Sequence, residues 1–155
     1  MAGPKDGVRF TYRPCKSNVC IRLIADLSQG GDMQLSGGPI DRAALSALGA
    51  EAAALLMNRN FGALADRFGY AFAYGREPAK AIEADLAACL AETSEASDRA
   101  VPSDAVIFFQ HNDANLFAAV ACVARMPEGP AVLMELVVTV KEADYHLSLE
   151  DIGRV

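Results

Sequence analysis

The fold is decided by residues 105–151, which read AVIFFQHNDANLFAAVACVARMPEGPAVLMELVVTVKEADYHLSLED. Four runs in this segment alternate side chains as a β-strand does, with a period of two residues. Short polar turns separate the runs at residues 111–114, 127–130 and 142–144. Turns of this length join neighbouring antiparallel strands. The segment is therefore predicted to form a four-stranded antiparallel meander.

The third run of this meander, residues 131–141, has two unequal faces. Its even-numbered side chains from 132 to 140 are all apolar, and they are predicted to face the core. The opposite face carries Leu133 and Val137 but also Glu135. Burying an unpaired carboxylate is costly, so Glu135 must meet water, a pocket, or a partner such as Arg125 on the neighbouring strand. Glu135 is thus the most informative single residue.

A helical part, residues 41–92, precedes the meander. Leucines and alanines after Asp41 recur at three-and-four spacing, the period of one helical face, and predict a helix of about four turns. The asparagines in residues 58–60 are suited to break and recap this helix, and the period resumes at Phe61 in a second helix. Pro78 suits the first turn of a third helix, which has an apolar stripe.

Four other segments are less regular. Alternating aromatic residues in GYAFAYG, residues 69–75, favour a short strand, although one of them also continues the preceding helical stripe. Residues 8–26 alternate on both sides of a turn and predict an opening β-hairpin. Residues 28–39 hold four glycines and indicate a mobile connection or an irregular edge, and residues 93–104 read as a surface loop. The whole chain is therefore expected to form one α+β domain, with helices packed on one face of a curved sheet.

Composition narrows the classes of function. The chain has 155 residues, of which 52% are hydrophobic and 22% charged, as in one compact globular domain. A net charge of -6 disfavours nucleic acid as a partner, because its backbone is bound by clustered Lys and Arg. Neither a secretory signal nor a run of about 18 apolar residues, long enough to span a bilayer, is present. We therefore expect a cytoplasmic protein with no membrane partner.

The cysteines and histidines do not form a recognisable metal site. Cys15 and Cys20 lie close enough in sequence for a disulfide or for half of a metal site, but no second pair completes a tetrahedral set. Cys89 and Cys122 lie in apolar periodic segments, where a free thiol behaves as a small hydrophobe. The His-Asn-Asp sequence at residues 111–113 is what a hairpin turn requires. No metal and no cofactor is therefore expected.

The order of three helices and a long antiparallel meander resembles the cone-shaped fold of the ketosteroid isomerase-like and polyketide cyclase-like superfamily, also called nuclear transport factor 2-like. Its best sequence echo is GREPAKAIEADLAACL, residues 75–90, and it covers residues 41–152. The resemblance implies a sheet that curves around the helices and encloses a pocket, in which catalytic members place an Asp or His with a Tyr. The hairpin at residues 8–26 departs from that pattern.

Candidate site residues follow partly from this resemblance. A carboxyl group in such a pocket would have a raised pKa suited to acid or base catalysis. The alternative for each charged candidate is a solvated position on a sheet face or a helix end. The catalytic candidates are Glu135, Asp66 and Tyr70. The ligand-binding candidates are Tyr74, Phe117 and Thr139.

Three hypotheses for function remain open. The first is a non-enzymatic domain that forms a homodimer through apolar strand positions opposite the core face, at Leu133, Val137 and Phe117, and that holds a small apolar ligand between sheet and helices. The second is a cofactor-free isomerase, dehydratase or cyclase that uses a pocket carboxylate and a Tyr hydroxyl. The third is a protein-interaction adaptor or regulatory partner, suggested by the acidic charge and by the predicted hairpin at residues 8–26.

Overall fold

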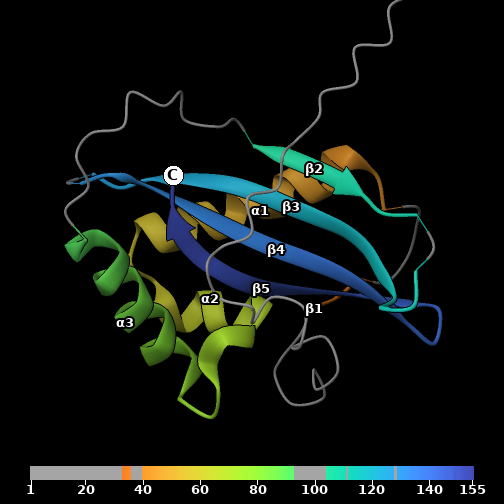
Figure 1. The fold of residues 1–155 in the computed structure, drawn as a ribbon, viewed down its shortest axis with the longest axis horizontal. Helices are drawn as coiled ribbons and strands as arrows, with labels where there is room; N and C mark the ends of the chain where they lie inside the picture. Colours follow the sequence, from red (N-terminus) through yellow and green to blue (C-terminus); the bar gives the residue numbers. More distant parts are fainter. Residues whose placement is uncertain (1–32, 36–39, 93–103, 111, 128) are drawn as a thin grey trace, which may run out of the picture.

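The computed structural model describes residues 33–35, 40–92, 104–110, 112–127 and 129–155. Their α+β architecture confirms the predicted fold class, three helices followed by an antiparallel meander (Figure 1). The predicted hairpin at residues 8–26 lies outside the described residues. The elements in chain order are β1 (Met33–Leu35), α1 (Arg42–Met57), α2 (Phe61–Phe68), the 3-10 helix η1 (Ala71–Ala73), α3 (Pro78–Ala91), β2 (Ala105–Phe108), β3 (Leu116–Arg125), β4 (Ala131–Lys141) and β5 (Asp144–Arg154).

The helices begin where capping residues hold their first amides. The Asp41 side chain accepts a hydrogen bond from the Ala44 amide at 2.8 Å, and α1 follows. Asn60 accepts from the Ala63 amide at 3.3 Å, which confirms the predicted break and recap before α2. Pro78 opens α3, as predicted.

The predicted strand at residues 69–75 is wrong, because this segment folds into η1 and a tight turn. Gly69 and Tyr74 both adopt positive φ angles, 67° and 48°, which bend the chain away from an extended path. Arg76 donates hydrogen bonds to the carbonyl oxygens of Phe72 and Ala73, at 2.8 and 3.0 Å. The Ala73 carbonyl also accepts from the Arg76 amide at 3.0 Å, so both carbonyls are held by Arg76 and not by a neighbouring strand.

The sheet has the strand order β1-β5-β4-β3-β2 within the described residues, and each neighbouring pair is antiparallel. The last four strands form the predicted meander. A fifth strand, β1, adds to the edge of β5 with Met33 opposite Leu147. It falls in the segment predicted as a connection or irregular edge, since three residues between glycine pairs carry no readable alternation.

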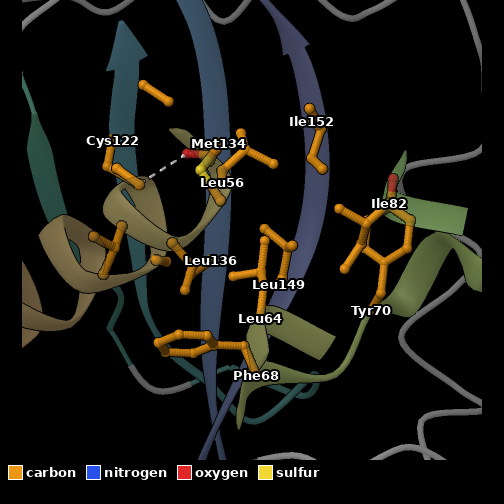
Figure 2. Packing of buried hydrophobic residues seen from close by; sticks show 14 of the residues in the cluster. Leu56, Leu64, Phe68, Tyr70, Ile82, Cys122, Met134, Leu136, Leu149 and Ile152 are labelled. Carbon is orange, nitrogen blue, oxygen red and sulfur yellow. Dashed lines mark hydrogen bonds between the residues drawn. The ribbon is translucent and has the colours of Figure 1, made fainter. Parts of the chain in front are cut away.

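The core lies between the helices and one face of the sheet, which we call the inner face. Figure 1 places α1 and α2 behind the sheet and α3 beside β5. The even-numbered side chains of β4 from 132 to 138 are fully buried, which confirms the predicted core face. Figure 2 shows Leu64 and Phe68 of α2 against Leu136 of β4. The interior is thus occupied by a continuous cluster of apolar side chains.

Close packing of α1 on the sheet depends on Gly49. This glycine is buried on α1, and a Cβ atom added there would lie 3.0 Å from Cγ1 of Val120 on β3. Real Cβ contacts are rarely that short. The missing side chain therefore allows α1 to approach β3 closely.

Phe117 does not face away from the core, as the sequence alternation predicted. The register of β3 on β4 shifts between Leu116 and Ala118, so Phe117 falls at a bulge. Its ring packs against the core cluster and meets the rings of Tyr145 and Phe108 edge-on, with centroids 4.7 and 5.5 Å apart. The extra residue redirects this side chain.

Candidate functional site

The side of the sheet that faces away from the helices, which we call the outer face, carries Glu135 near its centre. Strand pairing places Glu135 of β4 opposite Ala121 of β3 and Asp151 of β5. Of the alternatives for Glu135, a salt bridge to Arg125 is not formed, because Arg125 lies opposite Ala131 at the end of the strands. The charged neighbour of Glu135 is instead Asp151, a residue of like charge.

Asp151 reaches the outer face because of a bulge in β5. Two residues of β5, Glu150 and Asp151, occupy the space opposite Glu135, while Leu149 lies opposite Leu136. Without the extra residue, Asp151 would alternate onto the buried inner face. The bulge therefore creates the Glu135 and Asp151 pair.

Both carboxyl groups of this pair have raised pKa values. For Glu135, loss of hydration raises the pKa most and the charge of Asp151 adds to it. The residue is exposed as a whole, but neighbouring side chains still displace part of the water around its carboxylate. For Asp151, burial again raises the pKa most; a hydrogen bond of 2.9 Å from the Ile152 amide opposes it, and the charge of Asp85 adds to it. Protons thus bind this pair more tightly than isolated carboxylates.

A second polar group, formed by Tyr70, Arg76 and Asp85, joins η1 to α3. The Tyr70 hydroxyl donates to Oδ2 of Asp85 at 2.8 Å, and two Arg76 nitrogens donate to both oxygens of Asp85 at 3.0 Å. Burial raises the pKa of Asp85, but the hydrogen bonds from Arg76 and Tyr70 outweigh it and the net pKa is lowered. Burial and Asp85 raise the pKa of Tyr70. The Tyr70 hydroxyl is therefore engaged as a donor.

The two groups are linked electrostatically through Asp151. The charge of Asp151 raises the pKa of Tyr70, and the charge of Asp85 raises the pKa of Asp151. The structure thus places the predicted candidates Glu135 and Tyr70 in two separate polar groups, which influence each other through the charges of Asp85 and Asp151. Sequence reasoning missed Asp85, Asp151 and the role of Arg76. The Gly-Arg-Glu step before α3 was the one signal that pointed toward Arg76.

The other candidates lie elsewhere in the fold. Asp66 is exposed on α2, and Tyr74 is 54% exposed in the turn after η1, where its ring meets Phe72 edge-on. Thr139 lies on the outer face opposite Leu116 and His146, four residues along β4 from Glu135. The predicted catalytic and ligand-binding residues therefore do not form one site.

The remaining sequence candidates are structural. Asn112 accepts hydrogen bonds from the amides of Ala114 and Leu116, both at 3.1 Å, which confirms the predicted turn after β2. Cys89 and Cys122 are buried free thiols, and burial raises the pKa of Cys122 to about 12, so it stays protonated. Cys15, Cys20 and His111 lie outside the described residues.

Removing the charge of Glu135 is expected to stabilise the protein at neutral pH. The pKa of Glu135 in the folded state is raised above its ordinary value of 4.5. Its protonated form therefore stabilises the folded state. This contribution to stability is complete below the ordinary value and is lost as the pH rises through the folded-state pKa. Glu135→Gln should therefore raise the melting temperature near pH 7 and converge with wild type below about pH 4. Glu83→Gln on α3 is the matched control, for which no gain is expected. An equal melting temperature for wild type and Glu135→Gln at both pH values would contradict the raised pKa.

Chemically, the outer face offers two protonatable carboxyls beside apolar side chains. In the part of the chain that the structure describes, no three His, Cys, Asp or Glu residues lie close enough together to hold a metal ion.

No helix among the described residues is both long and apolar enough to cross a membrane. Comparison of the chain with protein-family models, with curated proteins and with solved structures finds no match.

Proposed function

We propose that this chain is a self-associating, non-catalytic domain that forms a homodimer through the outer face of its sheet. The observation that carries the proposal is the set of apolar side chains on this face, which is the side of the sheet away from α1 and α2 (Figure 1). Contiguous exposed apolar surface normally marks an interaction site. The occupant that fits best is a second copy of the chain.

Two apolar rows cross the outer face on either side of Glu135. One row runs from Ile107 on β2 through Ala119 to Val137 on β4, and the other pairs Val123 with Leu133. Ile107 is 48% exposed, and the other four are only half-buried. Small alanine side chains in β3 keep the middle of the face low. The surface is therefore apolar and partly exposed from β2 to β4, whereas β5 continues the first row with the buried Ser148.

The size of the face suits a stable dimer. Strands lie about 4.8 Å apart and advance about 3.4 Å per residue, so the 4, 10, 11 and 11 residues of β2, β3, β4 and β5 present about 590 Å², close to the lower limit of about 600 Å² per partner for specific interfaces. A standard interface buries about 800 Å² on each partner. A two-fold axis through the face makes the same patch contact itself, which is the usual symmetry of homodimers. The exposed Arg125 on this face can then approach the carboxylates of the second copy.

An isomerase-, dehydratase- or cyclase-like enzyme has less support. The hydroxyl that such an enzyme would use, on Tyr70, already donates a hydrogen bond to Asp85. The carboxylate that it would use, on Glu135, lies on the exposed outer face. A small apolar ligand between sheet and helices would compete with the core side chains that already fill this region. An adaptor role would use the same outer face with a different partner.

Two further proposals concern kinship and location. The likeness to the ketosteroid isomerase-like superfamily is supported by the order of three helices and then an antiparallel meander. A cytoplasmic location is supported by the buried free thiols of Cys89 and Cys122, which suit a reducing compartment.

Placing a charge on the outer face is expected to break the dimer. Wild-type protein at tens of micromolar should sediment with twice the 16.4 kDa mass of the chain, and Val137→Lys should sediment as a monomer because a long charged side chain would project from the apolar row into the second copy. Ala84→Lys adds the same charge on the exposed side of α3 and should leave the dimer intact. Circular dichroism checks that each variant is folded. A wild-type monomer at this concentration would refute the proposal.

A further inference from the structure

Among the residues that the structure describes, β2 forms one edge of the sheet and presents backbone groups outward. The Phe109 amide donates to the Phe117 carbonyl at 2.9 Å, so the backbone of Phe109 faces β3. Backbone groups alternate in direction along a strand, which turns those of Val106 and Phe108 away from β3. An outward row of amides and carbonyls is a template for pairing with another strand.

The side chains of this edge carry no charge. Residues 105–109 read AVIFF, and Ile107, Phe108 and Phe109 are 48%, 40% and 42% exposed. Native proteins usually protect edges with charged side chains on the strand itself, with proline, or with a covering element. Because β2 contains no charged residue and no proline, its protection must come from another part of the chain.

Arg42, the first residue of α1, supplies that protection. Its Nη1 donates to the outward carbonyl of Val106 at 2.6 Å, and its guanidinium carbon lies 5.6 Å from the centre of the Phe108 ring. One side chain therefore donates a hydrogen bond to a backbone carbonyl of the edge and also makes a cation-π contact with the aromatic ring beside it. Among the described residues, no other side chain is bonded to these outward groups.

The helix does not account for an arginine at this position. The N-terminus of a helix carries a partial positive charge, so a cation in its first turn is unfavourable. Asp41 already supplies the cap. The contact with β2 is what the Arg42 side chain adds.

We propose that Arg42 is a gate that keeps the β2 edge closed to the same strand of a second copy. With the guanidinium displaced, two β2 strands can pair antiparallel about a two-fold axis at Ile107, with Val106 of each copy opposite Phe108 of the other. A strand of this composition brings no like charges together when it pairs with itself. The surface is distinct from the outer face, since it uses backbone groups at the edge.

Removal of the gate tests this inference. In the monomeric Val137→Lys background, Arg42→Ala should raise the weight-average mass in sedimentation to about twice that of its parent at tens of micromolar, because a free edge is available to pair. In the wild-type background each dimer carries two such edges, so the mass should rise at least twofold. Lys80→Ala, which removes an exposed cation from α3, should leave the mass unchanged. The Val137→Lys background separates edge pairing from association through the outer face.

Proline identifies the backbone groups involved. Because the Phe108 amide points away from β3, Phe108→Pro removes one outward donor without breaking the sheet, as edge strands allow. Added to Arg42→Ala it should restore the parent mass, whereas Phe108→Ala, which removes only the ring, should not. Arg42→Gln replaces Arg42→Ala if the latter fails to fold. An unchanged mass without the guanidinium, or a raised mass that Phe108→Pro does not lower, overturns the inference.

Discussion

Replacement of Phe68 by alanine is expected to lower the free energy of unfolding by about 3–5 kcal/mol, the range for a large aromatic residue removed from a packed core. Phe68 ends α2, is fully buried, and lies against Leu136 of β4. The lost contacts and the space left behind both contribute to the loss. Urea denaturation followed by circular dichroism measures it.

Phe109→Ala is the matched control, because the same side chain is 42% exposed after β2. Surface substitutions usually change the free energy of unfolding by less than about 0.5 kcal/mol. Equal losses for the two variants would contradict the placement of Phe68 at the centre of the core.

The Asp85→Ala variant is expected to lose about 1.5–3 kcal/mol of unfolding free energy, since hydrogen bonds to a charged group are worth that much. It leaves the Tyr70 hydroxyl and the Arg76 guanidinium without their shared acceptor and loosens η1 from α3. The side chain of Arg76 is 43% exposed, so solvent compensates part of the loss and places it toward the lower end.

The effect of this variant depends on pH in a defined direction. The pKa of Asp85 in the folded state lies below its ordinary value of 3.8. The contribution of Asp85 to the free energy of unfolding is therefore complete above its ordinary pKa of 3.8 and is lost as the pH falls through the folded-state pKa. Wild type and Asp85→Ala should therefore approach each other in strong acid. Tyr70→Phe keeps the ion pair between Asp85 and Arg76, so it should lose only about 1 kcal/mol of unfolding free energy. A constant difference between wild type and Asp85→Ala down to low pH would contradict the lowered pKa.

The periodic parts of the chain could be predicted from sequence because each follows a local rule. Alternation along residues 131–141 identified the buried face of β4, and asparagines and Pro78 located the helix starts. The segment at residues 69–75 was misassigned because its alternating aromatics fit a strand. Its actual conformation depends on Arg76, whose side chain holds the carbonyls of the turn.

The site could be predicted only in part, because its members meet through strand pairing. Glu135 was identified as the exception on an apolar face, but its neighbour depends on how β5 pairs with β4. The bulges at Phe117 and Glu150 each displace a side chain from the position that simple alternation assigns. A bulge is a property of two strands together, so one strand's sequence does not disclose it.

The bulge at Glu150 also governs how this chain should be aligned with other sequences. Before the bulge the odd-numbered residues Leu147 and Leu149 face the core, and after it the even-numbered Ile152 does. A homologue with a regular last strand would match both halves only if a one-residue gap is placed at position 150. An ungapped alignment would set Asp151 against a core residue and hide a true relationship over the last residues of β5.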